Sequence, residues 1–347
     1  MSISHGDIPV LDISLLQDNP ADPDIASALV AAGHSVGFCY LTGHGIPTEQ
    51  EAVAMSVSHD FFRLELGEKT ALSIGNSPHF RGYTPLGNEI TRGARDWREQ
   101  IDIGLDEQTV STANGQPPWQ RLRGPNQWPP GLPAMAPAIG AWMTSMEALA
   151  VRCLRALAVG LGQSVDLFDD YMLPRGDPHL KIIRYAGQAD SDTSGPNSEQ
   201  ATGQGVGWHQ DSGLLTFILQ DGTEGLEVRA ADGRVVPAVP RPNTYLMNLG
   251  EMLQRATDGY LRATEHRVVS PPPGQERLSL AYFAHPSFET VVEPIRLPAA
   301  LAAAAPGGEN ADPNDPVFSQ FGDNYLKIRL RSHPDVADRF YADVRLG

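Results

Sequence analysis

The chain has 347 residues, of which 41% are hydrophobic, and its formal net charge at pH 7 is -16. This composition allows a large buried core, while the acidic balance argues against nucleic acid or an anionic membrane as a partner, because both attract basic patches. Since no apolar run approaches the roughly 18 residues of a membrane span, and the N-terminus lacks the basic start and apolar core of a signal peptide, we expect a cytoplasmic protein.

The first half of the chain predicts short strands and helices ahead of one long helix. Strands are expected at residues 8–13, 37–41 and 96–104, and helices from about residue 23 and from residue 48. The polar, Pro- and Gly-rich stretch 106–137 is expected to be a surface loop. Residues 138–161 carry apolar side chains at steps of three and four, which predicts a scaffold helix packed on a sheet. Cys39 and Cys153 lie among apolar neighbours, so we expect buried free thiols.

The second half predicts a β-rich body. A strand is expected at residues 179–185, and the Gly-, Ser- and Asp-rich stretch 186–204 is expected to be mobile. Further short strands are expected at residues 225–229, 235–239, 244–248, 264–270, 277–284 and 290–293. Short, regularly spaced strands separated by turn residues are typical of an all-β sandwich or barrel. A loop at 297–316 and a C-terminal helix through Phe321 and Tyr325 complete the chain.

The pattern His-x-Asp occurs three times, beginning at His5, His209 and His333. His5 lies near the start of the chain, and His333 precedes Pro334, which indicates a turn or a helix start. Only His209-x-Asp211 is followed by an apolar, strand-like run. Side chains two residues apart on a strand share one face, so this imidazole and carboxylate would supply two of the three protein ligands of a non-haem ferrous site.

A third ligand is available in His266, which lies in another strand-like segment. In a jelly roll, the sequence separation from Asp211 allows several strands to intervene and return beside the first. Two imidazoles and one carboxylate suit ferrous iron and leave three positions open for substrates. A structural zinc site would normally have four ligands, often cysteines, and neither cysteine is nearby in sequence.

Arg277-Leu278-Ser279 is the only Arg-x-Ser in the chain. On a strand, the Arg277 and Ser279 side chains face the same side, where a guanidinium fork and a hydroxyl form a receptor for a carboxylate. The alternative is an ordinary ion pair with an acidic residue at the rim of the barrel. The position of the motif after His266 favours the carboxylate receptor.

These motifs, in this order, resemble the 2-oxoglutarate and iron(II)-dependent oxygenases of the isopenicillin N synthase-like group. The resemblance covers roughly residues 8–104 and 179–283. Besides the motifs above, it is carried by Gly37-Phe38, Gly43-His44-Gly45, Arg81-Gly82-Tyr83, Asn248-Leu249-Gly250 and His266-Arg267-Val268.

The resemblance implies a mainly β fold with flanking helices, built on a distorted double-stranded β-helix, or jelly roll. The chain would divide into an N-terminal α/β region at residues 1–120 that packs on the core, a loop and scaffold helix at 121–175, the catalytic core at 176–295, and a C-terminal loop and helix at 296–347. We expect a monomer or a weak homo-oligomer.

The resemblance also implies the chemistry. His209, Asp211 and His266 would hold Fe(II), and the distal carboxylate of 2-oxoglutarate would meet Arg277 and Ser279. Tyr185 matches a position that often provides a further hydrogen bond to that carboxylate. With O2, the enzyme would convert 2-oxoglutarate to succinate and CO2 and oxidise a C–H bond, most often by hydroxylation.

The expected substrate is a small molecule, such as a secondary metabolite or an amino-acid derivative. Candidate residues for its pocket are Arg81, Tyr83, Phe283 and Trp208. Phe283 shares the strand face of Arg277, whereas Trp208 should point away from the face of the neighbouring His209. For Arg81, a structural ion pair is an alternative to substrate binding.

The sequence leaves two alternative functions open. Some members of the group oxidise their substrate without 2-oxoglutarate, as in isopenicillin N synthesis, and others desaturate or close rings. A different class of function, non-catalytic binding of a metal or small molecule on the same scaffold, is disfavoured by the intact ligand set and the intact Arg-x-Ser. Gly203, Gly205 and Gly207 precede His209 and end a mobile loop, which we expect to order or close when substrate binds.

Overall fold

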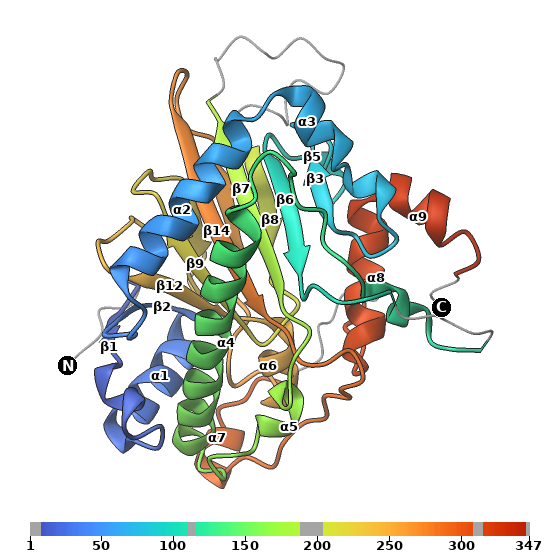
Figure 1. Cartoon of the computed structure of the whole chain (residues 1–347). Helices are drawn as coiled ribbons and strands as arrows, with labels where there is room; N and C mark the ends of the chain where they lie inside the picture. The colour runs from blue at the N-terminus through green and yellow to red at the C-terminus, as the bar shows by residue number, and fades with distance from the viewer. Residues whose placement is uncertain (1–7, 110–114, 188–203, 308–314, 345–347) are drawn as a thin grey trace.

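The computed structural model describes residues 8–109, 115–187, 204–307 and 315–344, and these form two β-sheets with flanking helices (Figure 1). The larger sheet has eight strands in the order β1 (Val10–Asp12), β2 (Phe38–Thr42), β12 (Tyr245–Leu249), β9 (Leu215–Gln220), β14 (Glu276–Ala284), β7 (His179–Ala186), β6 (Glu99–Gly104) and β3 (Gly82–Thr84). The smaller sheet has the order β11 (Val235–Pro237), β10 (Leu226–Arg229), β13 (His266–Val269) and β8 (Gln204–His209). This is the jelly-roll core with flanking helices that the sequence predicts.

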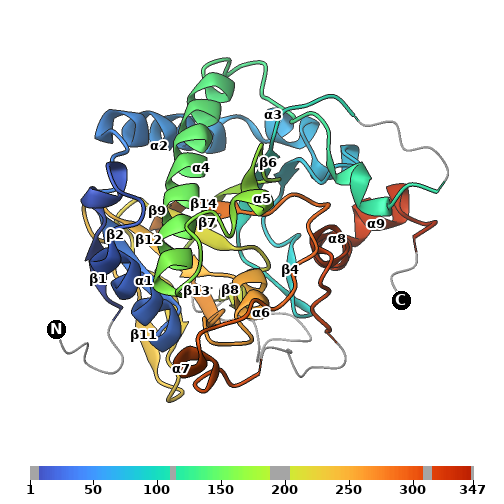
Figure 2. The same cartoon turned by 90° about the horizontal axis from the view of Figure 1, so that it is seen from below.

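The helices cover the outside of this core. They are α1 (Pro23–Ser35), α2 (Thr48–Arg63), α3 (Leu66–Ala71), α4 (Met135–Gly160), α5 (Asp169–Met172), α6 (Glu251–Ala256), α7 (Ala299–Ala302), α8 (Phe321–Ser332) and α9 (Pro334–Phe340). A short hairpin, β4 (Ile90–Thr91) and β5 (Ala94–Arg95), lies beside α8 (Figure 2). Within the described ranges, no helix combines the length and the apolar character needed to cross a bilayer.

The scaffold helix α4 packs across one face of the larger sheet (Figure 1). Its apolar stripe is buried as predicted, and Trp142 within this stripe is fully buried. The Trp142 indole N–H donates to the Tyr245 hydroxyl at 3.0 Å, and its ring meets Tyr282 edge to face. These contacts join the helix to β12 and β14, the strands that run past the candidate site. Cys39 and Cys153 are buried free thiols, as expected.

Two segments differ from what the sequence predicts or lie partly outside the described residues. The strand expected at 290–293 was wrong: the chain turns at Ser287–Thr290, and Val291 makes a single bridge to Gln320 ahead of α8. The expected mobile stretch at 186–204 falls mostly on residues 188–203, which lie outside the described residues. Gly205 and Gly207 belong to strand β8, so the expectation that they end a loop was wrong, and the closure expected of that loop stays a prediction.

A buried ionic network attaches α8 to the larger sheet. Oδ1 of Asp102, on β6, lies 2.8 Å from Nε2 of His179, 3.0 Å from the guanidinium of Arg329 and 3.8 Å from Nζ of Lys181. Burial alone would raise the pKa of Asp102, but Lys181, Arg329 and His179 hold that pKa well below its ordinary value. The network therefore fixes α8, a C-terminal element, against strands β6 and β7.

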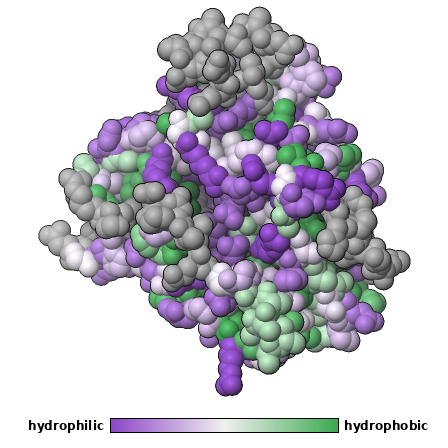
Figure 3. Space-filling model, turned by 180° about the vertical axis from the view of Figure 1, so that it is seen from behind, coloured by the Kyte–Doolittle hydropathy of each residue, from purple (hydrophilic) through white to green (hydrophobic). Residues whose placement is uncertain are grey.

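The surface seen from behind carries mostly polar residues. Hydrophilic residues gather near the centre of that face, and hydrophobic residues occupy smaller areas around it (Figure 3).

We predict that Asp102→Asn lowers the free energy of unfolding by about 3–5 kcal/mol at pH 7, because it leaves buried cations without their carboxylate. Because the folded pKa of Asp102 lies below its ordinary value of 3.8, the stabilisation is complete above that pH and is lost as the pH falls through the folded pKa. Urea unfolding measures the change. Asp60→Asn, which removes an exposed ion pair with Arg63, should change stability by no more than about 0.5 kcal/mol. Equal effects of the two substitutions would contradict the role of the network.

Candidate metal centre

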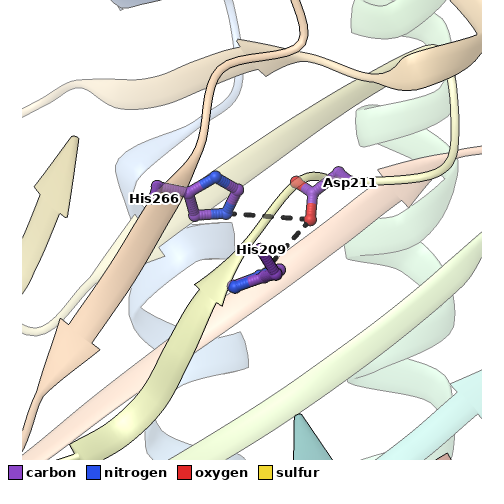
Figure 4. A group of neighbouring side chains, drawn as sticks. All are labelled: His209, Asp211 and His266. Atoms are coloured by element: carbon purple, nitrogen blue, oxygen red, sulfur yellow. Dashed lines mark ion pairs between the residues drawn. The ribbon is translucent and has the colours of Figure 1, made fainter. Parts of the chain in front are cut away.

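Three side chains converge where strands β8 and β13 lie side by side (Figure 4). His209 ends β8, His266 begins β13, and the two are direct partners in the strand register. Asp211 follows β8 by two residues. Nε2 of each histidine lies 3.7 Å from Oδ1 of Asp211, and the two imidazole rings are 4.3 Å apart between centroids. Three atoms that can ligate one metal ion therefore face a common point.

Backbone carbonyls set the orientation of both imidazoles. Nδ1 of His209 lies 2.8 Å from the carbonyl oxygen of Gly207, and Nδ1 of His266 lies 3.1 Å from that of Thr264. A carbonyl oxygen only accepts, so each Nδ1 carries a hydrogen, and Nε2 is the ring atom of each histidine that can ligate a metal ion. Burial, followed by the neighbouring His266 ring, lowers the pKa of His209 to about 3, which keeps its imidazole neutral.

Two hydrogen bonds orient the carboxylate. Oδ2 of Asp211 accepts from the Thr216 hydroxyl at 2.6 Å and from the Asn248 side-chain amide at 2.7 Å, which leaves Oδ1 free to face the histidines. Burial would raise the pKa of Asp211, but His266 and His209, with these two hydrogen bonds, hold the pKa below its ordinary value. The carboxylate is thus ionised and fixed in one orientation.

This donor set fits ferrous iron. Two neutral imidazoles and one carboxylate on a single side are the ligands of mononuclear non-haem iron sites, whose remaining positions are open. Closed structural zinc sites use four ligands, and within the described residues no cysteine belongs to this group.

A second group of possible ligands, Glu89, Asp102 and His333, also comes together. It already contains its own cations, since Nζ of Lys181 lies 2.5 Å from Oε1 of Glu89 and Arg329 pairs with Asp102. With its carboxylates neutralised by protein side chains, this group is an ion-pair network and needs no metal ion.

A cavity of about 920 Å³ opens beside the metal ligands, between the two sheets. Strand β14 contributes one inward face to it, carrying Arg277, Ser279, Ala281 and Phe283 at alternate positions. The paired strand β7 contributes the matching row, Tyr185, Ile183, Lys181 and His179, in the same order. The two rows run from a buried arginine at one end to aromatic rings at the metal end.

Arg277 is fully buried, and no ion pair involves it in the described parts of the chain. Its guanidinium donates to the side-chain oxygen of Gln220 at 3.0 Å, to the Thr223 carbonyl at 3.2 Å and to the Ser279 hydroxyl at 3.4 Å. The Tyr185 ring lies against it, 5.0 Å from ring centre to guanidinium. A buried cation without a carboxylate partner is costly unless an anion meets it, so the geometry suits an anionic ligand.

The four candidate substrate residues are placed differently. Phe283 lines the cavity, and its ring centroid lies 5.9 Å from that of His179 and 5.9 Å from that of His285. Trp208 is not among the residues that line it: its indole is stacked between the guanidinium groups of Arg229 and Arg267, at 4.2 and 4.8 Å.

Tyr83 and Arg81 are buried behind the cavity wall. The Tyr83 hydroxyl donates to Glu99 at 2.5 Å. The Arg81 guanidinium packs against Gly104, where a side chain would clash, and donates to the Leu122 carbonyl at 3.4 Å. Only Phe283 of the four candidates therefore faces the cavity.

Sequence reasoning did not assign Thr216 and Asn248 a role. A signal for them exists, because both are polar residues within otherwise apolar strands, and the two are register partners across β9 and β12. The sequence motifs also gave no indication that α6 brings Glu251 to the cavity and that α8 brings Lys327 and Arg331, because these helices lie outside the motifs that carry the metal ligands.

Two family models match the chain. The N-terminal model of non-haem dioxygenases in morphine synthesis covers residues 8–131, and the 2OG-Fe(II) oxygenase superfamily model covers residues 178–286. The chain is 30% identical to the 2-oxoglutarate-dependent dioxygenase frbJ of Dothideomycetidae sp., over 99% of this chain and 95% of that relative. It is 32% identical to homoarginine-6-hydroxylase 2-ODD-C23 of Glycine max, over 85% of this chain and 90% of the relative.

Solved structures share the fold. A full-length Neurospora crassa protein, solved in complex with alpha-KG and thymine, superposes with a TM-score of 0.73 at 24% identity, covering 94% of this chain and 99% of that chain. The enzyme described here couples the oxidative decarboxylation of 2-oxoglutarate to oxidation of a C–H bond, with Fe(II), 2-oxoglutarate and O2 as its cofactors and co-substrates. The chain belongs to the 2-oxoglutarate- and iron(II)-dependent oxygenases of the isopenicillin N synthase-like superfamily.

Proposed function

We propose that His209, Asp211 and His266 hold the iron and that Arg277 and Ser279 bind the distal carboxylate of 2-oxoglutarate. The carrying observation is the fully buried Arg277, which has no acidic partner among the described residues, at one end of a cavity whose other end holds the three ligand atoms. Iron, when bound at this site, supplies the activation of O2 for the oxidation.

The wall between these two ends suits the carbon chain of 2-oxoglutarate. It is formed by the apolar side chains of Ile183, Val206, Ile218, Leu226 and Val268. Apolar walls exclude water and strengthen the charged contacts at Arg277. The Tyr185 ring supports the guanidinium from the opposite strand, and Ser279 offers its hydroxyl beside it.

The proposed reaction is hydroxylation. Its atoms balance when 2-oxoglutarate loses CO2, one atom of O2 enters succinate, and the other enters the C–H bond of the substrate as a hydroxyl group. The chain contributes placement: Thr216 and Asn248 orient Asp211, and the carbonyls of Gly207 and Thr264 orient the two imidazoles.

We infer that the substrate is a small, charged molecule, such as an amino-acid derivative or a secondary metabolite, oxidised in the cytoplasm. A cavity of this size accepts a small molecule beside 2-oxoglutarate. Its wall also carries charged side chains from α6 and α8, namely Glu251, Lys327 and Arg331. The names of several plant relatives support this inference, because they are homoarginine hydroxylases and homoarginine is a charged amino acid.

We predict that Asp211→Ala abolishes iron-dependent succinate formation with little loss of fold, because the residue lines a cavity. Asn248→Ala, which removes one hydrogen bond to Asp211, should weaken Fe(II) binding by about 10–100-fold. Metal titration and succinate assays measure both effects. His59→Ala, on α2 and outside the cavity lining, serves as the control. Comparable metal affinity in Asp211→Ala would rule out the proposed ligand set.

We predict that Arg277→Gln weakens 2-oxoglutarate binding by about 100-fold, or about 2.7 kcal/mol, because it removes the charge that meets the distal carboxylate. Fe(II) affinity should be unchanged. The matched control is Arg267→Gln, which removes an arginine that pairs with Glu227 on the smaller sheet. An unchanged 2-oxoglutarate dependence in Arg277→Gln would show that the co-substrate binds elsewhere.

A further inference from the structure

Four charged side chains of the cavity wall come from α6, from α8 and from the segment before α8. They are Glu251, Asp315, Lys327 and Arg331, and all of them line the cavity. Nζ of Lys327 lies 2.7 Å from Oδ1 of Asp315, and the Arg331 guanidinium lies 2.9 and 3.1 Å from the two Asp315 oxygens. We call these four residues the mouth cluster.

Within the mouth cluster, the Asp315 carboxylate forms ion pairs with both Lys327 and Arg331. Lys327 also donates to the Pro316 carbonyl at 2.6 Å, which leaves one of its three N–H groups available, and Arg331 uses only one end of its fork on Asp315. This side of the mouth cluster therefore has donors and positive charge to offer an incoming anion.

Glu251 supplies the opposite charge. Over the described residues its carboxyl has no hydrogen bond and no ion pair. Burial raises the pKa of Glu251 to about 7, an effect that Lys327 opposes and Asp315 reinforces. The other carboxylates on the described cavity wall are occupied, as shown by Glu89 with Lys181 and Glu265 with Arg92. A half-buried carboxylate without a partner is unfavourable, so Glu251 is a receptor for a cation.

Glu251 is also tied to the metal centre. Its backbone N–H donates to the carbonyl oxygen of Asp211 at 2.8 Å. The mouth cluster and the metal ligands line the same cavity, so a ligand held by the cluster lies in the cavity that contains the metal centre.

We propose that the mouth cluster binds the zwitterionic head group of an α-amino acid substrate, with the ammonium group at Glu251 and the carboxylate at Arg331 and Lys327. The N–H groups that Lys327 and Arg331 have left over meet a substrate carboxylate, and the unpaired Glu251 carboxylate meets a substrate ammonium, which is the charge pattern of an amino acid. This inference rests on the proposed function and names the substrate class for the same site.

The test is a binding experiment on the full chain, loaded with Mn(II) and 2-oxoglutarate and kept free of oxygen. Calorimetry first measures 2-oxoglutarate binding. It then measures the twenty protein amino acids and L-homoarginine and, for each amino acid that binds, the analogue without its carboxylate and the analogue without its α-amino group. We expect at least one amino acid to bind about tenfold more tightly than either analogue.

Variants separate the two ends of the head group. Glu251→Gln should weaken the binding of amino acids about tenfold and leave the binding of the analogues without an amine unchanged. Arg331→Gln should weaken the binding of ligands that carry the carboxylate about tenfold and leave the binding of the analogues without it unchanged. The control is Arg339→Gln, which removes an exposed arginine on α9 that donates to the Gly75 carbonyl and should change neither affinity. If Glu251→Gln does not fold, Lys327→Gln and Arg331→Gln carry the test from the carboxylate side.

Equal affinity for an amino acid and one of its analogues would overturn the inference, as would unchanged binding in both Glu251→Gln and Arg331→Gln. Failure of every amino acid to bind while 2-oxoglutarate still binds would also overturn it and leave the proposed function intact. Failure of 2-oxoglutarate to bind would instead remove the proposed function, and the inference with it.

Discussion

The pair of hydrogen bonds that Thr216 and Asn248 donate to Asp211 is the interaction on which the site depends. They occupy one carboxylate oxygen and turn the other toward the two histidines. Their donors lie on β9 and β12 of the larger sheet, while the histidines lie on β8 and β13 of the smaller one. The ligand set therefore forms only when the two sheets are assembled, which makes the jelly roll itself part of the metal centre.

A second constraint determines what surrounds that centre. The Asp102 network holds α8 against β6 and β7, and α8 then presents Lys327 and Arg331 to the cavity. The same network consumes the charges of Asp102 and Glu89, so a group of residues that could hold a metal ion is an internal ion-pair network. On the part of the cavity wall that the structure describes, the charges left for ligands lie elsewhere, at Arg277 and in the mouth cluster.

Much of the fold could be predicted from the sequence, because strand alternation and helical periodicity are local. The same local rule placed Arg277, Ser279 and Phe283 on one face of β14 and turned Trp208 away from His209. The strand expected at residues 290–293 failed, because an apolar pair beside a turn does not show whether a partner strand is within reach.

The surroundings of individual side chains could not be predicted, because they depend on elements far apart in sequence. Arg81 and Tyr83 follow one another closely in a motif, yet Gly104 and Glu99 of β6 enclose them behind the cavity wall. The contribution of α8 was hidden for the same reason: its periodicity predicts a helix but not the partner of Arg329.

The most direct test is a crystal structure of the protein with Fe(II) and 2-oxoglutarate, grown without oxygen. We predict one metal ion bonded to Nε2 of His209, Oδ1 of Asp211 and Nε2 of His266. The distal carboxylate of 2-oxoglutarate should form an ion pair with the Arg277 guanidinium. A metal ion at Glu89 and His333, or a co-substrate that leaves Arg277 without an anion, would contradict it.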